Sequence, residues 1–475
     1  MSVAKNTFFL TSALVGQKIL SFVYFTLLAR FFGPEDIGKY TFALAFTTIF
    51  SIITDLGLTP FLVRETAKTK ERAGELLRAV LTLKIGLIVL AYGSVILASY
   101  LLGYPALIIK LIFIAGLIMA MDGIHLSFYG VLRGLGQLKY ESLGMVIGQT
   151  ITLALGGVFL LINPPLVVFL IALACGSVFN VIYSFFVIKK HGIKFLIAPG
   201  KEILKTIAKS AVPFALAGFF TKIYSYMDTV LLRHIKGDME VGWYSVPYKI
   251  TYAFQFLPLA LSAAIFPAIA NAWKNDRTKV QEIFEKALTY CLIISLPLAF
   301  GIASLAPQII LKIYGQPFAN SILPLEISIF GLIFVFLYFP IGAALNATDR
   351  QNVNTFFMGL TMVANIFLNL ILIPRFGAVG ASLAAVCTNA FLFFSTFIWS
   401  LRVVRPSKNF LHVFIKTIFS VAIMSATVLV FKKTIAWPLT IPLGAFVYLG
   451  LLYLLKTFSL EEIAKIKSTL KSFSA

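Results

Sequence analysis

Long apolar segments recur along the whole of this 475-residue chain, and they constrain its fold more than any other feature. A helix that crosses the roughly 30 Å hydrocarbon core of a bilayer needs about 20 mostly apolar residues. Fourteen segments meet that requirement, at residues 7–32, 38–61, 79–102, 106–132, 140–162, 165–188, 207–234, 241–271, 284–306, 320–346, 352–374, 378–401, 411–431 and 437–456. Because only short loops separate them, we predict an all-α integral membrane protein with about 14 transmembrane helices.

The composition excludes a soluble fold of this length. Hydrophobic residues make up 59% of the chain and charged residues only 12%, and the mean hydropathy is +0.94. A water-soluble globule has too little interior to hide that much apolar surface. The bilayer must therefore be the solvent for most side chains, and the N-terminal apolar segment, which continues to Phe32, is too long for a cleaved signal peptide.

Cysteines and sequence motifs indicate no enzyme, metal site or cofactor. The three cysteines, Cys175, Cys291 and Cys387, all lie within apolar segments, and an odd number there argues against a disulfide framework and against metal ligation. The chain has no phosphate-binding Gly-rich loop, no nucleophile elbow and no His-Glu metal motif. We therefore expect a protein that is not an enzyme, with no catalytic residues and no cofactor.

The distribution of basic residues predicts how the chain crosses the membrane. The net charge is +21, but without a soluble domain or a zinc pattern we expect no nucleic-acid partner. With the N-terminus in the cytoplasm and strict alternation, 27 of the 40 Lys and Arg residues fall on the cytoplasmic side, nine on the outer side and four within spans. This asymmetry follows the positive-inside rule. Both termini are therefore expected in the cytoplasm, and the protein in the cell membrane.

An internal repeat relates the two halves of the chain. Residues 18–40 and 222–244 align at an offset of 204 without a gap, with eight of 23 positions identical, including Lys18 with Lys222. Both copies turn through the pattern Gly-x-x-x-x-Gly-x-Tyr, in which glycines permit a backbone reversal. Two halves that both start in the cytoplasm form a parallel repeat, an architecture in which the substrate path lies between the halves.

The repeat predicts the domain organisation. We expect an N-terminal six-helix lobe at residues 1–190, a cytoplasmic linker at 191–206 and a pseudo-symmetric six-helix lobe at 207–403, with a cavity between the lobes. Residues 404–458 supply transmembrane helices 13 and 14. The tail 459–475 begins with a capping pattern and spaces apolar residues at helical intervals beside lysines. It is predicted to be an interfacial amphipathic helix, the alternative being a solvated tail.

Charged residues inside the spans are the candidate functional residues. A charge near the bilayer centre costs about 2.5–3.5 kcal/mol on insertion scales, so such a residue must face the bundle interior or a wetted cavity. Lys18 and Lys222 lie near mid-depth, and the repeat places them opposite each other, with Lys249 nearby. Arg30 and Arg233 lie near the outer ends of their spans, and Lys84 is expected to snorkel to the inner face.

Few carboxylates accompany these cations. They are Asp55, Asp122 with His125 on the same span, and Asp228, which is one and a half turns from Lys222. A cation-rich cavity suits an anionic substrate. The alternative interpretation is that these groups only pair with one another or snorkel, without any role in transport.

The sequence also resembles a known family, chiefly in residues 27–65. It is similar to the polysaccharide-biosynthesis flippases of the Wzx type, within the multidrug/oligosaccharidyl-lipid/polysaccharide exporter superfamily. The matching features are Ala29-Arg30, Gly33, Gly38, Tyr40, Asp55-Leu56-Gly57, Arg64-Glu65, Leu345-Asn346-Ala347 and the stretch 376–381. The resemblance extends over essentially the whole chain. It implies a flippase that translocates an isoprenyl-diphosphate-linked oligosaccharide across the cytoplasmic membrane by alternating access.

The resemblance suggests a role for each candidate residue. Substrate contacts to the diphosphate are assigned to Lys18, Lys222 and Lys249, with Arg30 and Arg233 near the outer exit and Arg64 at the inner entry. Ion coupling, by H⁺ or Na⁺, or a gate ion pair is assigned to Asp55, Asp228 and Asp122. Membrane lipids and the lipid-linked oligosaccharide are the expected partners.

Three other functions compete with this one. A cation-coupled multidrug or metabolite exporter of the same superfamily would favour acidic residues in its cavity, whereas lysines dominate here. A flippase for the peptidoglycan precursor is a second alternative. A membrane polymerase or glycosyltransferase is a third, although such enzymes usually need a sizeable outer loop that this chain lacks.

Overall fold

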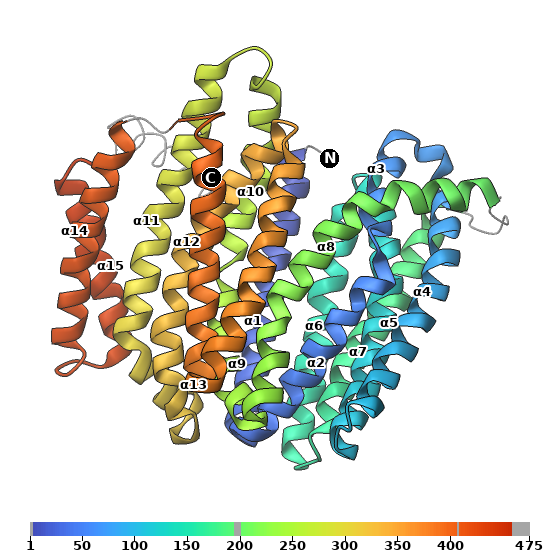
Figure 1. The fold of residues 1–475 in the computed structure, drawn as a ribbon, viewed down its shortest axis with the longest axis horizontal. Helices are drawn as coiled ribbons and strands as arrows, with labels where there is room; N and C mark the ends of the chain where they lie inside the picture. The colour runs from blue at the N-terminus through green and yellow to red at the C-terminus, as the bar shows by residue number, and fades with distance from the viewer. Residues whose placement is uncertain (1–2, 194–200, 406–407, 458–475) are drawn as a thin grey trace. The chain divides into compact units, whose positions relative to one another are not determined.

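The computed structural model describes residues 3–193, 201–405 and 408–457. Throughout these ranges the regular elements are helices, and no strand occurs within them. The α-helices are α1 (Val3–Phe32), α2 (Pro34–Asp55), α3 (Leu58–Lys68), α4 (Ala73–Leu101), α5 (Ala106–Gly134), α6 (Leu138–Leu161), α7 (Val167–Lys190), α8 (Lys201–Lys236), α9 (Asp238–Ala253), α10 (Phe256–Ala272), α11 (Arg277–Ile309), α12 (Ile322–Ala347), α13 (Gln351–Ser400), α14 (Lys408–Phe431) and α15 (Trp437–Leu454). Short helical turns η1 (Lys70–Arg72), η2 (Ile310–Tyr314) and η3 (Gln316–Ser321) connect some of them (Figure 1).

The predicted all-α membrane fold is confirmed. Among the described residues, 12 helical stretches are long and apolar enough to cross a membrane. One of these, α13, has 50 residues and a non-helical backbone at Gly377, so it comprises two arms that are each long enough to cross. Helix α8, with 36 residues, is also long enough to cross. Together they account for the fourteen predicted spans, and the chain is a multi-pass membrane protein.

Two predicted spans were wrong in detail, because the chain breaks inside each of them. Instead of one helix over 38–61, α2 ends at Asp55, and Leu56 (φ 39°) and Gly57 (φ 79°) turn the chain before α3 begins. Instead of one helix over 241–271, α9 ends at Ala253 and α10 begins at Phe256. Pro258 lies in the first turn of α10, where its missing N–H and its ring prevent continuation of the preceding helix.

The helices form two compact units. The first comprises Met1–Phe256 and Thr355–Thr388, and the second comprises Leu257–Asn354 and Asn389–Ala475. Every predicted site residue belongs to the first unit. This division follows local packing, so the lobes predicted at 1–190 and 207–403, the linker at 191–206 and the helix pair at 404–458 stay a prediction. The tail 459–475 lies outside the described residues.

The internal repeat is also present in the backbone conformation. The turn between α1 and α2 matches the turn between α8 and α9. Gly33 has φ 77° and ψ −179°, and its repeat equivalent Gly237 has φ 92° and ψ −178°. Each glycine N–H donates to the carbonyl four residues earlier, at 3.1 Å for Gly33 and 2.9 Å for Gly237. These positive φ angles are open to glycine at no steric cost. Both turns lie at the end of the first unit away from the N-terminus (Figure 1).

Candidate functional site

Two lysines from α1 and α9 are held by residues of the opposite helix. The ammonium of Lys18, on α1, lies 3.6 Å from the ring centroid of Tyr252 on α9. The ammonium of Lys249, on α9, donates a hydrogen bond of 3.0 Å to Ser21 Oγ and lies 5.5 Å from the ring centroid of Phe25, both on α1. The two cation–π contacts therefore cross between the helices.

This lysine pair has no acidic partner in contact with it. Among the described residues no ion pair includes Lys18 or Lys249, and the positive charge of Lys18 acts directly on Lys249. Aromatic rings and a hydroxyl stabilise an ammonium by about 0.5–2 kcal/mol at such sites, which is less than the desolvation that burial imposes. The field between α1 and α9 therefore favours an anion.

Lys222, the third predicted lysine, has different surroundings. Its ammonium lies 5.8 Å from the ring centroid of Tyr226, and the negative charges that act on it are those of Asp122 and Asp55. The structure thus brings Lys18 and Lys249 together, whereas Lys222 lies in the field of two carboxylates of the first repeat. The predicted placement of Lys18 opposite Lys222 stays a prediction.

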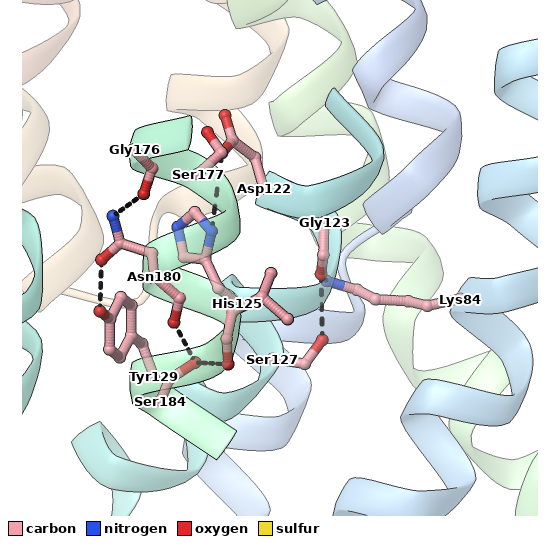
Figure 2. A network of polar contacts seen from close by, with 11 residues as sticks. Lys84, Asp122, Gly123, His125, Ser127, Tyr129, Gly176, Ser177, Asn180 and Ser184 are labelled. Carbon is pink, nitrogen blue, oxygen red and sulfur yellow. Dashed lines mark hydrogen bonds and ion pairs between the residues drawn. The ribbon is translucent and has the colours of Figure 1, made fainter. Parts of the chain in front are cut away.

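Asp122 belongs to a polar network between α5 and α7 (Figure 2). It accepts a hydrogen bond of 2.7 Å from Ser177 Oγ, and its Oδ1 lies 3.6 Å from Nδ1 of His125. Further along the same two helices, the Tyr129 hydroxyl donates to Asn180 Oδ1 at 2.6 Å. These contacts hold Asp122 in place while 44% of its side chain stays exposed.

Lys84 does not snorkel, and that expectation is wrong. Its side chain is entirely buried, with its ammonium 2.6 Å from Asp55 Oδ1. It also donates to Thr59 Oγ1 at 2.9 Å. A further hydrogen bond of 3.1 Å goes to the carbonyl of Gly123 (Figure 2). The break between α2 and α3 places Asp55 and Thr59 on either side of one turn, so both can reach the same ammonium. Asp55 is therefore the counter-ion of a buried lysine.

Asp228 is buried among neutral donors. Its carboxylate accepts hydrogen bonds from the Tyr244 hydroxyl at 3.0 Å and from Asn369 Nδ2 at 2.7 Å, and Asn365 also contacts it. The side chain of Asp228 is about 5% exposed. The two asparagines, one helical turn apart on α13, were missed by the sequence analysis. Their four-residue spacing within an apolar span was the available signal, because it places both on one helix face.

The arginines do not join the lysine pair. Arg233 Nε donates to Asp238 Oδ1 at 2.7 Å, and its guanidinium lies over the rings of Phe42 and Tyr104, at 4.3 and 4.6 Å from their centroids. Arg64 lies on α3 and pairs with Glu65 at 2.8 Å. Arg30, near the end of α1, is exposed.

Glu65, on α3, forms ion pairs with two exposed basic residues of the same helix. Hydrogen bonds from Lys68 and Arg64 lower the pKa of the Glu65 carboxyl below its usual value. Arg64 is therefore part of a local surface ion-pair group, and its predicted contact with substrate stays a prediction.

The chain has many membrane-spanning helices, an internal repeat and a lysine pair inside the first unit. Together these features define a membrane transporter. The fold matches the lipid II flippase MurJ in an inward closed conformation, with a TM-score of 0.74 at 17% identity over 93% of this chain and 97% of that one. The sequence model of the polysaccharide biosynthesis protein family matches residues 3–273, and the chain belongs to that family. The MatE model matches residues 213–371.

Two curated relatives extend over most of the chain. The "Probable low-salt glycan biosynthesis flippase Agl15" of Haloferax volcanii is 25% identical over 404 residues, covering 82% of both proteins. The "Capsular polysaccharide biosynthesis protein CapF" of Staphylococcus aureus is 21% identical over 387 residues, covering 80% of this chain and 95% of the relative. The predicted membership of the polysaccharide-biosynthesis family is confirmed.

Proposed function

We propose that this protein is a flippase that translocates an isoprenyl-diphosphate-linked oligosaccharide, a polysaccharide precursor, across the cytoplasmic membrane by alternating access. The observation that carries the proposal is the crossed pair Lys18 and Lys249, which no carboxylate of the described residues neutralises. The relatives named as a glycan biosynthesis flippase and a capsular polysaccharide biosynthesis protein support the choice of cargo.

The chemistry of a diphosphate fits this pair. A diphosphate and its sugars cannot enter hydrocarbon unaided, because they would lose their hydration without replacement. Two ammonium groups can replace that hydration with charge-assisted hydrogen bonds, which are about twice as strong as neutral ones. Without substrate, Tyr252 and Phe25 hold the ammonium groups of Lys18 and Lys249, and the headgroup takes the place of the rings.

The other cations extend the path in this proposal. Lys222 is the third contact to the headgroup, and Asp55 and Asp122 set its local field. Arg64 acts at the inner entry, and Arg30 and Arg233 act near the outer exit. Both termini lie in the cytoplasm in this proposal, which the predicted excess of basic residues on that side supports. The chain itself carries out no chemical reaction and needs no cofactor.

Asp228 is the strongest candidate for coupling to H⁺ or Na⁺. It is buried, no cation of the described residues pairs with it, and its contacts are neutral donors. A buried carboxylate of this kind is more stable when it takes up a proton or a monovalent cation. Asp55 already has Lys84 as its counter-ion. Asp122 is half exposed beside His125 and is the second candidate for coupling.

Depletion of the protein in its native cell is the test of this function. We expect the lipid-linked oligosaccharide to accumulate in the inner leaflet, measured as glycolipid protected from a membrane-impermeant lectin or oxidant on the outside. Re-expression of the wild type should restore its exposure, and Lys18→Gln/Lys249→Gln at equal protein level should not. An unchanged distribution of the glycolipid on depletion would reject the function.

A cation-coupled multidrug or metabolite exporter is the second candidate, because the MatE model matches residues 213–371. Such an exporter of cationic drugs would bind them badly beside Lys18 and Lys249, since like charges repel in a low dielectric. The same depleted cells distinguish the two functions. A flippase leaves their sensitivity to cationic dyes unchanged, whereas a drug exporter makes them more sensitive and leaves the glycolipid distribution as it was.

A further inference from the structure

The second glycine of each repeated turn motif lies against the backbone of the other repeat. A Cβ atom built on Gly38, in α2, would lie 1.7 Å from the carbonyl oxygen of Asp238, the first residue of α9. A Cβ atom built on Gly242, in α9, would lie 1.8 Å from the carbonyl oxygen of Pro34, the first residue of α2. Gly38 and Gly242 are 204 positions apart, and so are Pro34 and Asp238. The contact is therefore reciprocal and obeys the repeat.

No side chain separates α2 from α9 at this point. Real Cβ atoms essentially never approach another heavy atom closer than 3.0 Å, and here both obstructing atoms are backbone. Neither helix can accept even an alanine without moving away from its neighbour. The first glycines of the two motifs differ in this respect, because a Cβ on Gly33 or Gly237 would meet nothing within 4 Å.

A cluster of side chains, linked to the glycine contact through Asp238, also joins the two repeats. Arg233 donates to Asp238 within its own repeat and lays its guanidinium over Phe42 and Tyr104 of the first repeat. Tyr104 in turn has its hydroxyl 2.8 Å from Nε2 of His234. The two repeats are thus in contact at the end of the first unit that carries both turns. In the proposed orientation this end is the outer face.

We propose that the reciprocal contact of Gly38 and Gly242 is the closed gate of the transport path on this face. In a transporter built from two repeats, the repeats separate on one face while they close on the other. A backbone-to-backbone contact between equivalent helices can be lost as a whole in a rigid movement, since no side chain has to be withdrawn from a pocket. The residue size at positions 38 and 242 then sets the balance between closed and open forms. This inference needs a two-sided path but does not depend on the substrate.

The test measures the separation of α2 and α9 directly. Cys175, Cys291 and Cys387 are replaced by serine, and spin labels are attached to Glu35→Cys and Met239→Cys, which are exposed, repeat-equivalent positions. Pulsed electron resonance on the full chain in lipid nanodiscs then gives the distance distribution. We expect Gly38→Ala and Gly242→Ala each to raise the ratio of long to short distances by about tenfold, because overpacking is relieved only when the helices part. The double variant should exceed either single one.

Matched controls replace glycines that face open space. Gly93→Ala on α4 and Gly157→Ala on α6 add the same methyl group where nothing lies within 4 Å. Their distance distributions should equal that of the parent protein. Equal distributions in the folded Gly38→Ala and Gly242→Ala variants as well would overturn the proposal.

A second variant keeps the test decisive if the alanine variants do not fold. Phe42→Leu removes one of the two rings under Arg233 without adding an atom to the glycine contact. We expect it to shift the distances in the same direction, by a smaller factor, and no shift would overturn the proposal. Because these measurements contain no substrate, they can succeed even if the chain carries a cargo other than a lipid-linked oligosaccharide.

Discussion

The ammonium of Lys84 lies 2.6 Å from the carboxylate of Asp55 although none of the Lys84 side chain reaches the surface. Removing one member of a fully buried ion pair costs about 3–5 kcal/mol. The cost lies below that range here, because 33% of the Asp55 side chain is exposed. We therefore expect Lys84→Met to lower the melting temperature of the detergent-solubilised protein strongly. Lys84→Met combined with Asp55→Asn should recover much of that loss, since neither charge remains.

The surface pair Lys286 and Glu282 is the matched control for this cycle. It also joins lysine to a carboxylate, but both side chains are about half exposed, at 47% and 60%. We expect Lys286→Met to change stability by no more than about 0.5 kcal/mol. Equal melting temperatures for Lys84→Met and Lys286→Met would contradict the structural importance of the buried pair.

The lysine pair should be essential for transport through its charge. A hydrogen bond from a charged donor contributes about 1.5–3 kcal/mol, so Lys18→Gln or Lys249→Gln should lower the flipping rate in proteoliposomes by roughly 10- to 100-fold. The corresponding arginine variants keep the charge and should retain more activity. Lys110→Gln, which changes an exposed lysine at the start of α5, is the control and should transport normally. Full activity of Lys249→Gln would remove it from the substrate path.

The ring of Tyr252 should matter by orienting Lys18. Tyr252→Leu removes the cation–π contact of 3.6 Å but no charge, and such contacts are worth about 0.5–2 kcal/mol. We expect a loss of transport of roughly 2- to 10-fold, smaller than that of Lys18→Gln. Tyr252→Phe keeps the ring and should restore the rate. If Phe and Leu at this position behave alike, the ring does not hold the lysine.

Asp228 should determine the response of transport to an ion gradient. Asp228→Asn keeps one acceptor oxygen, for Tyr244 or for Asn369, but cannot bind a proton or a sodium ion as a carboxylate does. In proteoliposomes with an imposed pH or sodium gradient, the wild type should be accelerated and the variant should not. A variant that follows the gradient as the wild type does would exclude Asp228 from coupling.

The kink of α13 depends on a carboxylate from α9. Glu240 Oε2 accepts a hydrogen bond of 2.7 Å from the N–H of Ala378, directly after Gly377 with its φ of 56°. Loss of such a cap costs about 0.5–2 kcal/mol, so Glu240→Ala should lower the melting temperature and Glu240→Gln should lower it less. Gly377→Ala should be the most damaging, because a residue with a Cβ is strained at this φ of 56° and the methyl group would also displace the carboxylate that caps the kink. Unchanged melting of Gly377→Ala would contradict this geometry.

The sequence predicts the number of spans and the repeated turn, because both depend on local properties of the chain. Hydropathy marks where a helix can cross, and the glycine motif marks where the chain reverses. The break after Asp55 could not be recognised in the same way. Leu56 is an ordinary apolar residue of a predicted span, so only the backbone reveals the left-handed turn that it makes with Gly57.

The candidate site was predicted only as a set of charges. Lys18 and Lys249 were identified because a charge within a membrane span is costly and is rarely present without a structural or functional role. Their aromatic partners, Tyr252 and Phe25, each lie on the opposite helix and depend on how α1 packs against α9. No pattern in the sequence of either helix predicts that packing. The same limit explains Lys84. Its depth in the span suggested snorkelling, whereas its partner Asp55 comes within reach only through the break in α2.

Tyr24 and Asp228 occupy equivalent positions 204 residues apart, and each lies near the equivalent tyrosine of its own repeat, Tyr40 or Tyr244. A duplicated ancestral gene would have started with the same residue in both places. The present chain has a neutral phenol in one copy and an acid in the other. In the proposed function, the two repeats therefore differ in their capacity to bind a proton or a cation at this position, and exchanging the copies would move the acid to the other repeat.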